Sequence, residues 1–177
     1  MTHYTDIDRT ASLTRLYPDL FSVSRTVLYV GAHDTRFDYA DEFRAAGCSV
    51  TVLEAYAPNA EYLWEHCEWL AGVTNVDLRT WIPDRAWDVT FWWHGPEHVA
   101  AAELDACIQK LVACTRQVCV LGAPFGYYPQ GAAYGNEYER HLCAIRKGML
   151  ERHGFRCEYL GGEDVEGSGV VAVKEVA

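Results

Sequence analysis

Two apolar segments, each ending at a chemically distinctive residue, constrain the fold of this chain more than any other feature. The first, Thr26–Val30, is rich in β-branched residues and runs into Gly31, while the second, residues 49–53, is followed at once by Glu54. With a helix between them, these segments form a βαβ unit. In such a unit a glycine permits the tight turn after the first strand, and a carboxylate at the next strand tip meets the ribose hydroxyls of an adenosine-type cofactor.

The composition excludes several classes of protein. Half of the 177 residues are hydrophobic, which in a chain of this length predicts one domain with a sizeable core. The formal net charge is −10, and no basic run occurs, so we expect no nucleic-acid partner, because phosphate binding needs clustered Lys and Arg. No apolar stretch approaches the ~20 residues of a membrane span, and we expect no membrane partner.

The cysteines indicate the compartment. The chain has seven cysteines without a CxxC pair or a zinc-like spacing, and it shows no signal peptide. We therefore expect reduced thiols and a cytoplasmic protein.

Apolar runs alternate with helical patterns along most of the chain. Strands are predicted over residues 26–30, 49–53, 73–76, 88–93, 117–121, 156–160 and 169–176. Helices are predicted from Asp34 or Thr35 to Gly47, and over residues 58–69, 99–114 and 137–153. Short links between such elements predict an α/β fold, a doubly wound and mostly parallel sheet with helices on both faces, closed by an antiparallel pair.

The N-terminal residues stand apart from this alternation. A short helical pattern lies within residues 8–20, and Pro18 interrupts it. We expect residues 1–25 to form an N-terminal cover segment and residues 26–177 to form the main domain.

In order and spacing, these segments resemble the class I S-adenosylmethionine (SAM)-dependent methyltransferase family from about residue 27 to residue 176. The motifs that carry the resemblance are residues 27–33, residues 52–54, Asp77, residues 87–94 running on to Glu97-His98, Ala123-Pro124, His141 and Gly154-Phe155. No single motif is specific for the family, but the occurrence of all of them in the same order along the chain is specific. The resemblance implies a Rossmann-like sheet of seven strands in the order 3-2-1-4-5-7-6 with strand 7 antiparallel, SAM as cofactor, and methyl transfer.

The sequence also departs from the family's pattern. Tyr29 stands where the family usually has an acidic residue that helps hold the amino acid end of the cofactor, and His33 and Thr35 stand where further glycines are usual. Either a variant set of groups holds the cofactor or its binding is weakened or lost. The alternative function is therefore a non-catalytic binding module on the same scaffold. A nicotinamide-dependent oxidoreductase is a weaker alternative, because the chain lacks the glycine pattern of such enzymes and because the closing hairpin does not fit their fold.

The candidate cofactor-binding residues are Gly31, His33, Glu54, Asp77 and Trp93. Glu54 is the strongest, because a carboxylate at the carboxyl edge of a parallel sheet can accept two hydrogen bonds from ribose; a solvated strand-end charge is the alternative. By the resemblance, Asp77 would accept from the adenine amino group, whereas on its own it reads equally well as a loop cap.

The segment His94-Gly95-Pro96-Glu97-His98 carries the candidate catalytic residue. It matches the His-x-x-Glu-His pattern of inverted zinc proteases, whose ligands lie on one helical face. Gly95 and Pro96 would break such a helix, so we expect no metal site. His94 is instead the candidate general base or acceptor-positioning group. In the alternative, His94 only packs against backbone, and Glu97 favours a helix dipole.

The loop over residues 122–135 is predicted to close over the acceptor. It is longer than usual connections, rich in Gly, Pro and Tyr, and placed at the same edge of the sheet as Gly31 and Glu54. The candidate substrate-binding residues are Tyr128, Tyr134, Asn136 and His141; a packing loop and a surface-helix histidine are the alternatives. Because little chain lies outside the core fold, we expect a small or medium-sized acceptor, with a protein acceptor as the alternative. The sequence indicates neither the acceptor's identity nor the oligomeric state.

Overall fold

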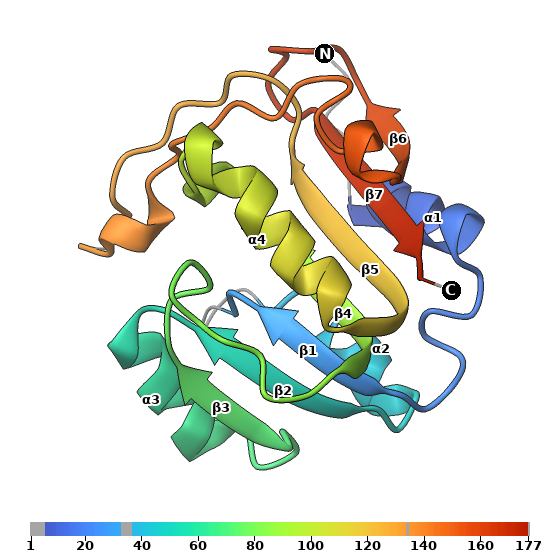
Figure 1. Ribbon diagram of the computed structural model, residues 1–177, viewed down its shortest axis with the longest axis vertical. Helices are drawn as coiled ribbons and strands as arrows, with labels where there is room; N and C mark the ends of the chain where they lie inside the picture. The colour runs from blue at the N-terminus through green and yellow to red at the C-terminus, as the bar shows by residue number, and fades with distance from the viewer. Residues whose placement is uncertain (1–5, 33–36, 134, 177) are drawn as a thin grey trace.

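The computed structural model describes residues 6–32, 37–133 and 135–176, which form one seven-stranded sheet with helices on both faces (Figure 1). The strands are β1 (Thr26–Val30), β2 (Ser49–Glu54), β3 (Gly72–Asn75), β4 (Trp87–Trp93), β5 (Thr115–Pro124), β6 (Arg156–Leu160) and β7 (Gly169–Glu175). The helices are α1 (Asp6–Leu16), α2 (Ala40–Ala45), α3 (Ala57–His66) and α4 (Ala101–Ala113), with 3-10 turns η1 (Pro96–His98), η2 (Glu137–Glu139) and η3 (Glu151–His153).

The strand order β3-β2-β1-β4-β5-β7-β6 confirms the predicted topology. Strands β1 to β5 pair in parallel, while β7 pairs antiparallel with both β5 and β6. The strand order reverses direction at the β1–β4 pair, which is where open α/β sheets usually hold a ligand beyond the carboxyl ends of the strands.

Successive side chains in a strand point to opposite faces of the sheet. Both faces of the central strands are buried, because helices cover each of them. On one face, Leu28, Val30 and Trp92 pack with the apolar side of α4, which crosses β4 and β5 in Figure 1. On the other face, Tyr29 and Trp93 pack with apolar residues of α1, α2 and α3.

Helix α1 belongs to this second layer. Its Leu13 is fully buried and its Leu16 nearly so, and the helix contacts β6 and β7. The Arg156 side chain donates a hydrogen bond to the carbonyl oxygen of Leu16 at 2.6 Å. The helix ends two residues before Pro18, as its sequence predicts. The division of the chain at residue 25 stays a prediction.

The predicted helix over residues 137–153 is wrong. Only the turns η2 and η3 form there, because the backbone of this stretch bonds to other segments instead of to itself. His141 donates its N–H to the Gln130 carbonyl, Leu142 and Cys143 donate to the Glu97 carbonyl, and a β-bridge joins residues 126 and 145. Gly148 has a φ of 86°, which a helix does not allow.

The first predicted crossover helix is shorter than expected. Helix α2 begins at Ala40, after Tyr39 in a left-handed conformation with φ 64°. The predicted caps Asp34 and Thr35 lie outside the described residues. No helix in the described part of the chain has both the length and the apolar character that crossing a membrane requires.

Candidate functional site

A cleft opens beyond the carboxyl ends of the parallel strands. It spans about 660 Å³ when the space open to solvent is counted. Gly31 after β1, Glu54 at the tip of β2, Asp77 after β3 and His94 after β4 all line it. Parallel strands deliver their carboxyl ends to the same edge of a sheet, so four of the predicted residues meet in one place.

Gly31 makes the turn that begins the cleft. Its φ is +77°, and its N–H donates to the Leu53 carbonyl at 2.9 Å. A Cβ at this position would meet nothing within 4 Å, so the need for glycine is conformational. The backbone here is therefore open to a ligand.

Glu54 is a buried carboxyl group in the wall of the cleft. The residue is 5% exposed, and its Oε1 accepts a hydrogen bond from the Tyr56 N–H at 2.7 Å. Burial raises the pKa of Glu54 to about 7, and the nearby charge of Glu139 acts in the same direction. A buried carboxyl group of this kind gains most from hydroxyl donors placed against it.

Asp77 lines the cleft and also stabilises the turn that follows it in the chain. Its carboxylate accepts from the backbone N–H of Arg79 at 2.8 Å and pairs with the Arg79 guanidinium at 2.6 Å. Burial opposes ionisation, but these bonds from Arg79 outweigh it and lower the pKa of Asp77. The loop-cap interpretation therefore describes the side chain's present partners, and a ligand would share the carboxylate with Arg79.

The structure does not bring Trp93 to the cleft. Trp93 lies on the opposite face of the sheet, packed edge-on against Tyr39, and its neighbour Trp92 lines the cleft instead. The alternation of side chains along β4 decides this. Val30 lines the cleft, and Trp92 is its register partner in β4, so both side chains lie on the same face of the sheet.

His94 stands at the end of β4 with both ring nitrogens held. Nε2 accepts a hydrogen bond from the Arg9 guanidinium at 2.7 Å, and Nδ1 lies 3.5 Å from Glu97 Oε1. The backbone of His94 is left-handed, with φ 49°. Such a conformation in a residue other than glycine is uncommon and is found at functional turns. His94 lines the cleft, and its role there stays a prediction.

Glu97 lies behind the cleft lining, in contact with His94 and His98. Its side chain is nearly enclosed, at 2% exposure for the residue, between His94 and His98. Burial opposes ionisation, but the hydrogen bond and charge of His94 outweigh it and lower the pKa of Glu97. The sequence pattern that could have indicated this arrangement is an acidic residue between two histidines after a buried strand.

The loop residues divide between the cleft and its surroundings. Asn136 lines the cleft, and its Oδ1 accepts from the Tyr138 N–H at 2.9 Å; Tyr138 and Glu139, which sequence reasoning missed, also line it. Tyr128 is exposed and His141 is half-buried, and neither lines the cleft. His33 and Tyr134, also predicted as site residues, lie outside the described residues.

Comparisons with known proteins identify the fold. No protein-family model matches this sequence, and no curated protein matches it significantly. Solved structures do match, among them the DhpI–SAM–HEP complex, with 19% identity, a TM-score of 0.66, and coverage of 96% of this chain and 86% of DhpI. The fold is that of a class I SAM-dependent methyltransferase.

Two further matches have the same methyltransferase fold. The N-methyltransferase NodS from Bradyrhizobium japonicum WM9, in complex with S-adenosyl-L-homocysteine (SAH), has 13% identity and a TM-score of 0.68, covering 96% of this chain and 86% of NodS. The magnesium protoporphyrin IX methyltransferase ChlM from Synechocystis PCC 6803 with bound SAM has 13% identity and a TM-score of 0.63, covering 95% of this chain and 77% of ChlM.

Proposed function

We propose that this protein is a SAM-dependent methyltransferase that acts on a small or medium-sized acceptor. One fold can host many activities, so the residues of the site must carry the argument. The main support for the proposal is that Gly31, Glu54 and Asp77 line one cleft. They follow successive strands in the order in which an adenosine-type cofactor needs a glycine turn and acidic residues.

Each of these residues has a proposed role. Glu54 accepts hydrogen bonds from the ribose hydroxyls, since its buried carboxyl group lies at the tip of β2. Asp77 faces the adenine amino group while it keeps its bond to Arg79. Gly31 lets the backbone approach the ligand, and the Trp92 indole supplies an apolar wall.

His94 is the proposed general base. When bound, SAM supplies an electrophilic methyl group. With SAM held in the cleft, His94 Nε2 would take the proton that the acceptor loses as it is methylated. Arg9 must first release Nε2. The Glu97 carboxylate holds the Nδ1 side of the ring and stabilises the imidazolium that forms.

The acceptor side of the cleft is proposed to be formed by Asn136, Tyr138 and the loop that precedes them. Tyr128 and His141 lie beyond the cleft lining, so they contact only an acceptor that extends past it. We propose a small-molecule acceptor in preference to a protein, because the chain adds little to the core fold. The free thiols of the seven cysteines support a cytoplasmic location.

A non-catalytic binding module is the second candidate, and Tyr29 favours it. The Tyr29 ring is 1% exposed and packs against Phe37 and Phe91 on the face away from the cleft. Strand β1 therefore presents no acidic side chain at the position where the resemblance implies a contact with the amino acid end of SAM.

Calorimetric titration with SAM, SAH and NAD tests the proposal. We expect binding of SAM and SAH and no binding of NAD, followed by SAH formation when candidate acceptors are supplied with SAM. Binding of NAD alone would overturn the proposal. Binding of SAM with no turnover across a broad acceptor screen would favour the binding module.

A further inference from the structure

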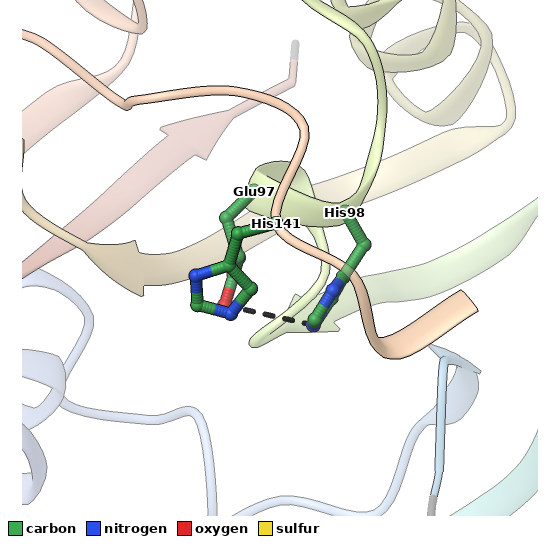
Figure 2. Close-up of side chains that lie close together, drawn as sticks. All are labelled: Glu97, His98 and His141. Carbon is green, nitrogen blue, oxygen red and sulfur yellow. Dashed lines mark ion pairs between the residues drawn. The ribbon is translucent and has the colours of Figure 1, made fainter. Parts of the chain in front are cut away.

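Three side chains beside the cleft form a compact cluster, shown in Figure 2. Glu97 and His98 come from η1, and His141 comes from the segment after η2. One nitrogen or carboxylate oxygen from each residue lies within 4.8 Å of the atoms offered by the other two. Histidine nitrogens and a carboxylate oxygen are the donors that transition-metal ions prefer in proteins.

The backbone fixes the ring nitrogens of both histidines. His98 Nδ1 lies 3.3 Å from the carbonyl oxygen of Arg140, and His141 Nδ1 lies 2.5 Å from the carbonyl oxygen of Tyr128. A carbonyl oxygen can only accept, so each Nδ1 carries the hydrogen and each neutral ring keeps its lone pair on Nε2. Metal-binding histidines are held in this way, with the second nitrogen bonded to a carbonyl or carboxylate.

The carboxylate of Glu97 supplies an independent observation. His98 Nε2 lies 3.9 Å from Glu97 Oε1. The other oxygen, Oε2, is buried and has no hydrogen-bond partner among the described residues. An unsatisfied buried carboxylate oxygen is unfavourable, and a cation bound to the Glu97 carboxylate would offset part of this cost.

We propose that Glu97, His98 and His141 bind one divalent transition-metal ion, with Zn²⁺ as the first candidate. Two nitrogen donors argue against Mg²⁺ and Ca²⁺, which prefer oxygen. A tetrahedral Zn²⁺ with bonds of about 2.0–2.1 Å holds its donors roughly 3.4 Å apart, so the three side chains close in by about 1 Å on binding. Three protein ligands leave a fourth coordination position open.

The expectation of no metal site rested on Gly95 and Pro96 breaking a helix. The structure instead brings Glu97 and His98 of that segment together with His141, a third donor from outside it. Residues 96–98 form a 3-10 turn, and the third donor comes from His141, whose neighbours Leu142 and Cys143 donate their N–H groups to the Glu97 carbonyl oxygen. The cluster therefore needs no continuous helix.

The open coordination position gives the ion a role in acceptor binding. His98 lines the cleft near His94, so an acceptor that enters the cleft can reach the ion with an oxygen atom. A coordinated hydroxyl loses its proton more readily, which would assist its attack on a methyl group. This role rests on the proposed methyltransferase function, whereas metal binding itself does not.

Zinc titration of the full chain, after treatment with a chelator and without SAM, tests the metal site. We expect tight binding of one ion per chain, measured by calorimetry and by elemental analysis after dialysis. His141→Ala and Glu97→Gln should each weaken Zn²⁺ binding by about 100-fold or more, because each removes a ligand. Circular dichroism spectra establish that each variant is folded, and His141 is half-buried, so its removal leaves the core intact.

Two matched variants control for other donors. His66→Gln removes an exposed imidazole in α3, away from the cluster, and should bind Zn²⁺ like the wild type. Cys143→Ser removes the thiol next to the cluster in sequence and should also leave the affinity unchanged, because no thiolate takes part. Co²⁺ in place of Zn²⁺ then reports on the open position, since adding acetohydroxamate, an oxygen ligand, should shift its visible absorption.

The outcomes separate the metal site from the proposed function. Failure of the wild type to retain Zn²⁺, or wild-type affinity in both His141→Ala and Glu97→Gln, would overturn the metal site. A Co²⁺ spectrum that acetohydroxamate leaves unchanged would overturn the open position. SAH binding without Zn²⁺ binding leaves the methyltransferase proposal standing alone, and Zn²⁺ binding without SAH binding leaves the metal site standing alone.

Discussion

The Oε1 atom of Glu97 lies 3.5 Å from Nδ1 of His94, so a buried carboxylate contacts a side chain that lines the cleft. Glu97 is almost fully buried, while His94 lines the cleft. A carboxylate in this position favours the ring form with its hydrogen on Nδ1, and Nε2 then accepts the hydrogen bond from Arg9. The proposed role of His94 as general base depends on this contact.

Replacing His94 by alanine should separate catalysis from cofactor binding. If His94 Nε2 takes the acceptor's proton, His94→Ala should lower turnover by about 10²-fold or more and leave SAH affinity nearly unchanged. The measurements are the initial rate of SAH formation, with an acceptor found by screening, and calorimetric titration with SAH. Lower stability with an unchanged rate per folded molecule would show that His94 only packs.

Replacing Glu54 by alanine should weaken cofactor binding. The change removes a charge-assisted contact to the ribose worth roughly 1.5–3 kcal/mol, so the SAH dissociation constant should rise by about 10- to 150-fold. Glu61→Ala, at an exposed position in α3, is the matched control and should bind SAH normally. Wild-type affinity in Glu54→Ala would remove Glu54 from the ribose site.

Glu54 should also give the unliganded protein a measurable pH dependence. Its pKa is raised from 4.5 to about 7, so the folded state holds a proton that the unfolded state has lost between these values. The stabilisation from Glu54 is therefore fully present below about pH 4.5 and is lost as the pH rises through about 7. A pKa difference of about 2.5 corresponds to about 3 kcal/mol.

Glu54→Gln isolates this effect, because the amide does not titrate. Urea unfolding at pH 5 and pH 8 should show a larger loss of unfolding free energy on going to pH 8 in the wild type than in Glu54→Gln. The expected difference is roughly 2–3 kcal/mol. Equal pH dependence in the two proteins would contradict the raised pKa of Glu54.

Gly95 should tolerate no side chain, because the Trp92 indole occupies the space. A Cβ built on Gly95 would lie 1.8 Å from Trp92 Nε1. Gly95→Ala should therefore lower the unfolding free energy by about 1–3 kcal/mol through overpacking, and it should weaken SAH binding because Trp92 lines the cleft. Gly131→Ala is the control, since a Cβ there meets nothing within 4 Å. Equal stability and affinity in the two variants would show that Trp92 moves aside freely.

The parts of the fold that follow from local pattern could be predicted from the sequence. Apolar runs gave the seven strands to within a few residues, and the family resemblance gave their order. The convergence of Gly31, Glu54 and Asp77 followed from topology, because parallel strands bring their carboxyl ends to one edge. Their roles stay predictions until a cofactor is titrated.

The helix predicted over residues 137–153 failed for a physical reason that no local pattern contains. The N–H groups of His141, Leu142 and Cys143 bond to carbonyl oxygens of Gln130 and Glu97, and these tertiary bonds outweigh a weak helical propensity. The same bonds bring His141 beside Glu97 and His98, although 43 positions separate it from His98 in the chain.

The strands, the glycine turn after β1 and the acidic residue at the tip of β2 could be predicted without the structure, because they depend on short-range spacing and side-chain chemistry. Three features depend on the folded chain: Trp92 and not Trp93 faces the cleft, Glu97 is buried under His94, and His141 lies beside Glu97 and His98. These features depend on strand parity, on burial and on backbone hydrogen bonds between distant segments, which exist only once the chain has folded.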